Sequence, residues 1–264
     1  MMNGFLSGAR KRERMTALAG LAAITLFAWI YVIHAAGSET GMNSTGMRGM
    51  SMPVIQTWQP GDFLSTFLMW TVMMAGMMMP SAAPMILAFL EVSRRRQPDH
   101  AALPSAVTFI LGYLAAWASF SAVAALMQWG LQAANVLSPR MAGANPVFDG
   151  TLVILAGIYQ FTPLKKACLF SCRTPLGFLI AEWRDGSGGA FGMGVHHGVY
   201  CVGCCWLLMA LLFVVGVMNI LWSAIIAGVV LLEKAIPGGS WISRLIGALA
   251  IAWGALLLVH AAGM

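Results

Sequence analysis

Charged residues are scarce in this chain: Asp, Glu, Lys and Arg make up only 9%, whereas 59% of the residues are hydrophobic. A soluble domain carries about 25% charged residues, because its water-facing surface needs them. The shortage excludes a soluble globular protein of this length and favours a polytopic membrane protein. The net charge of +6 is modest, and in this class it reflects cytoplasmic loops, not a nucleic-acid-binding surface.

Cysteine is also sparse, and its five residues are an odd number. A fully paired set of intramolecular disulfides is therefore excluded. Methionine, in contrast, is abundant at 20 residues. Met packs flexibly in any apolar core, but its thioether is also a soft ligand for Cu(I), so only the positions of the methionines can separate these two roles.

Long apolar runs predict an all-α membrane bundle of about seven transmembrane helices. The first run follows a basic head and is interpreted as an uncleaved span, because it is long for a signal peptide. The expected spans are Thr16–Ala36, Phe63–Leu90, Pro104–Leu131, Val147–Pro163, Ala190–Val217, Ile220–Ile236 and Trp241–His260. Within the second run, Pro80 and Pro84 are expected to kink or break the helix.

The distribution of basic residues predicts how these spans are oriented in the membrane. With the N-terminus inside, only Arg48 and Arg140 of the fifteen Lys and Arg residues fall in outer loops. The positive-inside rule then predicts an N-terminus inside and a C-terminus outside, as in a multi-pass protein of the bacterial cytoplasmic (inner) membrane. We expect three parts: a basic head and first span (1–36), a Met-rich outer loop (37–61) and a six-span metal-binding membrane domain (62–264).

The motif "HHGVYCVGCCW" interrupts the fifth span from His196 to Trp206. Residues three or four apart share a helix face, so His197, Cys201 and Cys204 form one stripe with Cys205 at its edge, and His196 points roughly a right angle away. Thiolate and imidazole groups suit Cu(I) or Zn(II), so we predict a metal site with these five ligands. Gly194 and Gly198 have small-xxx-small spacing, which predicts that a neighbouring helix approaches closely.

A single helix rarely supplies every ligand of one metal ion, so we expect further donors from other segments. Cys168 and Cys172 in "CLFSC" are four residues apart and would share a face if that stretch is helical. Met73 and Met77 of the second span stack along one helix line, with Met74 and Met78 on a neighbouring line. Four methionines of the outer loop are further candidates for copper capture, because this polar loop has no apolar core to fill: Met42, Met47, Met50 and Met52.

Other polar residues near span ends are interpreted as helix-end anchors, not as ligands. They are Tyr159, Gln160, Glu233 and Lys234.

Four ordered motifs carry a resemblance: "WTVMMAGMMMPSAAPM", "GIYQFTPLKKACLFSCRTP", "GVHHGVYCVGCCWLLMALLFVVGVMN" and "EK" at Glu233. Together they resemble a bacterial family of predicted metal-binding integral membrane proteins, some members of which are labelled copper chaperones. The resemblance extends from about Trp58 to the end of the chain and leaves out the first span. It implies a metal-binding membrane protein, with copper as the metal, and it supplies no catalytic activity to carry over to this chain.

The leading hypothesis is a membrane protein that binds a soft ion, Cu(I) above Zn(II), for copper delivery or transport. Its partners would be the lipid bilayer and a copper-dependent enzyme under assembly or a copper carrier protein, and no nucleic acid. The alternative is a membrane thiol–disulfide oxidoreductase that uses Cys201 and Cys204 as a C-x-x-C pair. A haem or quinone carrier is disfavoured, because the other histidines, His34, His100 and His260, lie at span ends.

Overall fold

The computed structural model describes residues 2–45, 60–96, 102–137, 143, 145–236 and 240–262. Throughout these ranges the regular structure is helical, with one isolated bridge between Leu137 and Gly143 and no strand. The helices are α1 (Met2–Thr45), α2 (Pro60–Arg96), α3 (Ala102–Ala133), α4 (Pro146–Tyr159), α5 (Pro163–Arg173), α6 (Pro175–Glu182), α7 (Gly186–Ala210), α8 (Leu212–Val215), α9 (Ile220–Ala235) and α10 (Ser240–Ala262).

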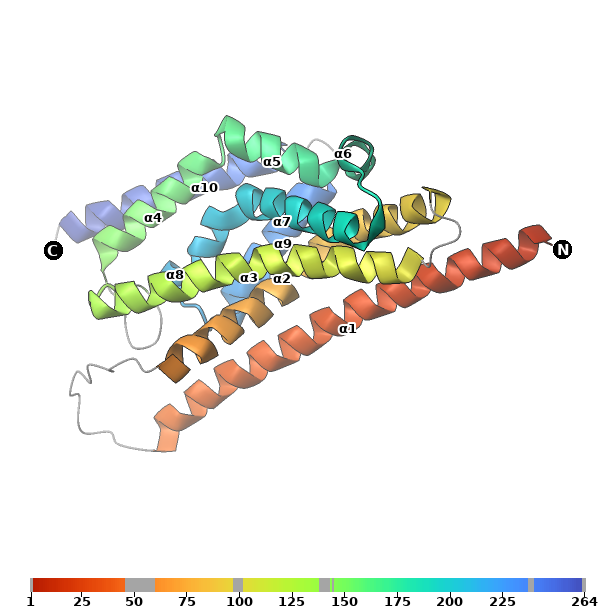
Figure 1. The fold of residues 1–264 in the computed structure, drawn as a ribbon. Coiled ribbons are helices and arrows are strands. Elements are labelled where there is room, and N and C mark those ends of the chain that lie inside the picture. The colour runs from red at the N-terminus through yellow and green to blue at the C-terminus, as the bar shows by residue number, and fades with distance from the viewer. Residues whose placement is uncertain are drawn as a thin grey trace.

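The long helices run back and forth along one common direction, and the two termini lie at opposite ends of the bundle (Figure 1). In the described ranges, five helical segments are long and apolar enough to cross a membrane, and the bent pair α4–α5 is a sixth if it counts as one span. These observations agree with a multi-pass membrane protein. The expected sixth span, Ile220–Ile236, is present as α9, which has only 16 residues.

The core lies between α2 and α7. In α2, 61% of the most apolar window is buried and in α7 it is 56%, compared with 17% in α1 and 11% in α10. The outermost helices therefore present apolar side chains to the surroundings, as a lipid-facing helix does. Methionines fill much of the α2 core, where Met74, Met78 and Met79 are completely buried.

The two prolines of the second span do not break it. Pro80 and Pro84 both lie inside the continuous helix α2. Hydrogen bonds from outside the main-chain ladder support this region: the Ser81 and Tyr113 hydroxyls both donate to the Met78 carbonyl, at 2.8 and 3.3 Å. The carbonyls that lose an amide donor to Pro80 and Pro84 are those of Gly76 and Pro80, so the bonds to Met78 add to the helix without replacing the lost ones.

Two stretches expected to separate spans are partly helical. The first expected loop begins as helix, because α1 continues to Thr45 and includes Met42 in its last turn. Met47, Met50 and Met52 lie outside the described residues. Leu164–Gly189 contains most of α5 and all of α6. Thr162 caps α5 by accepting a hydrogen bond from the Lys165 amide, and Pro163 provides the first helical residue.

Glycines bring α3 and α7 into close contact, as the small-residue spacing predicted. A Cβ atom on Gly194 would lie 2.0 Å from the Phe109 carbonyl oxygen, and one on Gly112 would lie 2.1 Å from the Phe191 carbonyl oxygen. Gly198 faces Ala116 and Tyr113 in the same interface. The backbones can approach this closely only because these positions lack side chains. The approach brings Tyr113 of α3 to the cysteines of α7.

Candidate metal centre

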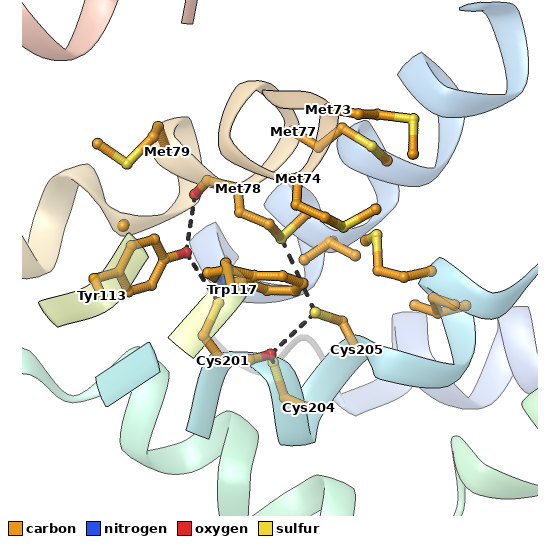
Figure 2. Close-up of a cluster of buried hydrophobic side chains, with 14 of the residues drawn as sticks. Met73, Met74, Met77, Met78, Met79, Tyr113, Trp117, Cys201, Cys204 and Cys205 are labelled. Atoms are coloured by element: carbon orange, nitrogen blue, oxygen red, sulfur yellow. Dashed lines mark hydrogen bonds between the residues drawn. The ribbon is translucent and has the colours of Figure 1, made fainter. Parts of the chain in front are cut away.

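The ligand stripe expected on α7 is present and buried. His197, Cys201, Cys204 and Cys205 all lie in α7, and each is at most 2% exposed. All five cysteines of the chain are free thiols. In Figure 2 the three α7 cysteines lie opposite the methionines of α2. The helical period, which places residues 197, 201, 204 and 205 on one face, therefore directs them into the core and not toward lipid.

The second pair of cysteines approaches this stripe from α5. The Cys172 thiol lies near the thiols of Cys201 and Cys204, close enough to be influenced by both. Cys168, one turn earlier, lies against the neighbouring glycine: a Cβ atom on Gly203 would be 2.9 Å from the Cys168 sulfur. Gly203 therefore leaves the space that the α5 cysteines occupy beside α7. The two cysteine motifs, about 30 residues apart in the sequence, form one cluster.

The methionine at the cluster is Met78, not Met73 or Met77. The Cys205 and Met78 sulfur atoms are 4.0 Å apart. Met73 and Met77 instead line a narrow space next to Ala28 and Ser223, between α2, α1 and α9. Figure 2 shows the same division, with Met78 between the cysteines and the two other methionines. The structure thus does not bring the two predicted methionines to the cysteines, whereas a methionine of the neighbouring line reaches them.

Three polar groups converge around Cys201. The Lys234 ammonium group lies 2.9 Å from the Cys201 sulfur, and the Tyr113 hydroxyl lies 3.1 Å from it. The same ammonium group donates to the Ser81 hydroxyl at 3.1 Å. Lys234 lies in the last turn of α9, as expected of a helix-end residue, and it also contacts the cysteine cluster, which the sequence did not predict. In an apolar core, an ammonium group of this kind supplies the counter-charge that a thiolate requires.

Two of the thiols make hydrogen bonds within their own helix. Cys204 donates to the Cys201 carbonyl oxygen at 3.1 Å, and Cys205 donates to the same oxygen at 3.0 Å. These bonds direct both sulfur atoms along α7. Accordingly, in the part of the chain that the structure describes, no three His, Cys, Asp or Glu side chains form a set arranged to hold a metal ion.

The two histidines occupy different surroundings. The buried His197 ring lies among aromatic rings, with centroids 5.7 Å from Tyr113 and 5.5 Å from Phe178. Its Nδ1 atom has no hydrogen-bond partner among the described residues. His196 points away from the cysteines, as the helical period predicted, and pairs with Glu182 of α6 at 3.1 Å. Only His197 therefore lies on the cysteine side of α7.

A buried ion pair connects α5 to α9. The Lys165 ammonium group contacts the two Glu233 carboxylate oxygens at 2.9 and 2.8 Å, and the side chains are only 1% and 2% exposed. Lys165 also donates to the Gln160 side-chain oxygen. Gln160 and Glu233 lie at helix ends, as expected, and in addition both belong to a buried polar network. Their network joins the α4–α5 bend to α9, and the same α5 presents Cys168 and Cys172 to α7.

A sequence alone offers little signal for these polar partners. Lys165 and Lys166 are adjacent and chemically alike, so the sequence does not show which of them is buried. Glu233 and Lys234 are adjacent residues at the end of one span. The sequence did draw attention to Glu233 and Lys234, as polar residues at a span end and as the "EK" pair of the resemblance, but neither observation identified their partners. Tyr113 lies in an ordinary apolar span, and only the close contact of α3 with α7 brings its hydroxyl to Cys201.

The fold and the cluster together define a helical protein of the membrane type with a buried centre of thiol and thioether groups. The sequence model of the copper chaperone family PpoB2 matches residues 67–257, well over half of the chain. The chain therefore belongs to this copper chaperone family and has a copper-related role. No curated protein and no solved structure shows significant similarity to it. The matched range includes α7 and the cysteines of α5, whereas α1 lies outside it.

Proposed function

We propose that the protein binds Cu(I) in the membrane through the cluster of Cys172, Cys201, Cys204, Cys205 and Met78, and passes the ion to a copper protein. The observation that carries this proposal is convergence. Sulfur groups from α2, α5 and α7, which are distant in the sequence, lie at one buried place. Packing alone needs apolar volume there, and it does not need thiols from two separate motifs.

The donor set fits Cu(I) in particular. Thiolates and thioethers are soft ligands, which favour Cu(I), and two or three of them are enough for an ion that must later be released. Cys172 with Cys201 and Cys204 supplies one such set, and Cys205 with Met78 supplies an adjacent thiol–thioether pair. Zn(II) would need four well-directed donors, so it is the weaker alternative for this cluster.

His197 and Cys168 extend the cluster at its two sides. His197 lies one turn before Cys201 on α7, and its unpartnered Nδ1 atom is a free donor in a buried place. Cys168 lies one turn before Cys172, against Gly203. A soft ion could therefore move between neighbouring donors by ligand exchange, which requires sites that bind and still release. His196 is part of the predicted ligand set, but its contact with Glu182 leaves it outside this first group.

The predicted membrane topology accompanies this function. We infer seven crossings, with the N-terminus in the cytoplasm and the C-terminus outside, in a bacterial inner membrane. The positions of the termini at opposite ends of the bundle agree with an odd number of crossings (Figure 1). The Met-rich segment 37–61 would then lie outside, where it could exchange copper with a carrier protein or with an enzyme under assembly. Delivery and transport are both consistent with this arrangement.

Anaerobic titration with Cu(I) tests the proposal. The full-length protein in detergent competes with a chromophoric Cu(I) chelator, and we expect at least one tightly bound equivalent. The triple variant Cys201→Ser/Cys204→Ser/Cys205→Ser should lose it. Met78→Leu should weaken binding, whereas the matched variant Met73→Leu should not, because Met73 faces α1 and α9.

Other outcomes of this titration assign other functions. If Met73→Leu weakens binding as much as Met78→Leu, the ligands follow the methionine line predicted from the sequence and not the observed cluster. If the wild-type protein binds no copper but Cys201 and Cys204 form a disulfide with a measurable redox potential, the thiol–disulfide oxidoreductase is the better assignment. Preferential binding of Zn(II) would refute the choice of metal.

A further inference from the structure

A basic cleft lies between α1 and α2, far along the chain from the cysteines. It has a volume of about 540 Å³, and it is lined by Lys11, Glu13, Arg14, Leu87, Ala88, Leu90, Glu91, Arg94 and Arg95. Both helices change from apolar to charged sequence here: the apolar run of α1 begins at Thr16, and that of α2 ends at Leu90. The cleft therefore lies where the hydrocarbon core of a bilayer would give way to its headgroups.

The charges of the cleft are unbalanced. Four basic side chains face two acidic ones, which leaves a net charge of +2. Arg94 contacts Glu13 at 3.5 Å and Glu91 at 3.2 Å, and Arg95 contacts Glu91 at 2.9 Å. These pairs occupy both carboxylates. Lys11 and Arg14 have no ion-pair partner within the described part of the chain, so they remain available to an external anion.

The other side of the cleft is apolar. Leu87 and Ala88 are half-buried and Leu90 is buried, and all three line the same space as the basic groups. A free inorganic anion gains nothing from this wall. A membrane phospholipid, in contrast, presents a phosphate next to acyl chains and matches both sides of the cleft. Basic pockets between membrane helices on the cytoplasmic side bind anionic headgroups for the same reason.

We propose that the α1–α2 cleft binds an anionic glycerophospholipid, with its phosphate on Lys11 and Arg14 and its acyl chains against Leu87 and Ala88. The lipid joins α1 to the rest of the bundle. This role fits the position of α1, which lies outside the family match at residues 67–257 and is the less buried partner of α2. The proposal does not depend on copper binding.

The test measures binding of phosphatidylglycerol to the full-length protein in neutral detergent, by native mass spectrometry and by titration. Phosphatidylcholine and inorganic phosphate serve as comparison ligands. We expect Lys11→Gln/Arg14→Gln to weaken phosphatidylglycerol binding by about 30-fold, since each basic residue near an anionic headgroup contributes a factor of about five. The matched control Arg12→Gln/Lys166→Gln removes the same charge from residues that do not line the cleft and should bind as the wild type does.

A variant with the opposite expected effect distinguishes loss of the binding site from misfolding of the double variant. Glu13→Gln removes one acidic group from the cleft and should tighten phosphatidylglycerol binding by about fivefold. The proposal is overturned if phosphatidylcholine binds equally well, or if the control variant loses as much binding as the cleft variant. It is also overturned if millimolar phosphate displaces the lipid completely, because the site would then recognise a free anion.

Discussion

Replacing Glu233 by Gln should destabilise the protein strongly, because it leaves the Lys165 ammonium group buried without its counter-ion. The two side chains are 1% and 2% exposed, and the ammonium group contacts both carboxylate oxygens within 2.9 Å. Removing one member of a buried ion pair costs about 3–5 kcal/mol. The loss comes from the remaining charge, since Gln keeps the shape of the side chain and one hydrogen-bond acceptor.

The consequence should extend to the cysteine cluster. Lys165 lies on α5, two turns before Cys172, so the ion pair holds the helix that presents Cys172 to Cys201. We expect Glu233→Gln to lower the thermal unfolding midpoint in detergent by about 10 °C. It should also weaken Cu(I) binding, and a Cys172→Ser change in the same background should then add little further loss.

A double variant supplies the matched control. Lys165→Met/Glu233→Leu removes both charges and keeps the apolar volume, and such replacements of buried ion pairs are often neutral or stabilising. Its midpoint should therefore return close to that of the wild type. Equal stability of Glu233→Gln and the wild type would refute the reasoning, as would a double variant no more stable than the single one, because the buried unpaired charge could then not be the cause.

Two further predictions concern the helix contact and the counter-charge. Gly194→Leu should prevent folding or greatly lower the yield of folded protein, because a side chain would overlap the α3 backbone; Gly192→Leu, with nothing within 4 Å of its Cβ position, should express normally in the same size-exclusion assay. Lys234→Met should slow alkylation of Cys201 by about tenfold in a variant that retains only this cysteine, because the thiolate is the reacting form. Lys166→Met is the control for the loss of a positive charge, and an unchanged alkylation rate in Lys234→Met would show that Lys234 does not support a thiolate.

The amphipathic stripe of α7 is a local property, and the sequence was enough to predict it. The helical period places His197, Cys201 and Cys204 on one face whatever surrounds them, and the structure shows that face buried. The spacing of Gly194 and Gly198 predicted a close neighbouring helix in the same way, and the structure identifies that helix as α3. Membrane class and helical fold follow from composition, since long apolar runs with so few charges have no other stable arrangement.

The prolines of α2 were expected to kink or break the helix, and the helix does not break at them. Proline disrupts an isolated helix because it lacks an amide donor, yet α2 continues through Pro80 and Pro84. The hydroxyl groups of Ser81 and of Tyr113, on a different helix, bond to the nearby Met78 carbonyl. The Tyr113 bond comes from a different helix, so an analysis of one segment at a time could not include it.

Composition, helical period and glycine spacing therefore determined the class of protein, the α7 stripe and the presence of a helix packed closely against it. Only the tertiary structure decided which other groups meet that stripe. Met78 and not Met73 reaches Cys205, Lys234 contacts Cys201, and Lys165 pairs with Glu233. The physical reason is that these contacts depend on how each helix is rotated and positioned against another, and this is set by packing across the whole bundle. Nothing in the local sequence distinguishes Met78 from Met73, Met74 and Met77, or Lys165 from Lys166. The sequence alone could therefore not identify which of these residues makes the contact.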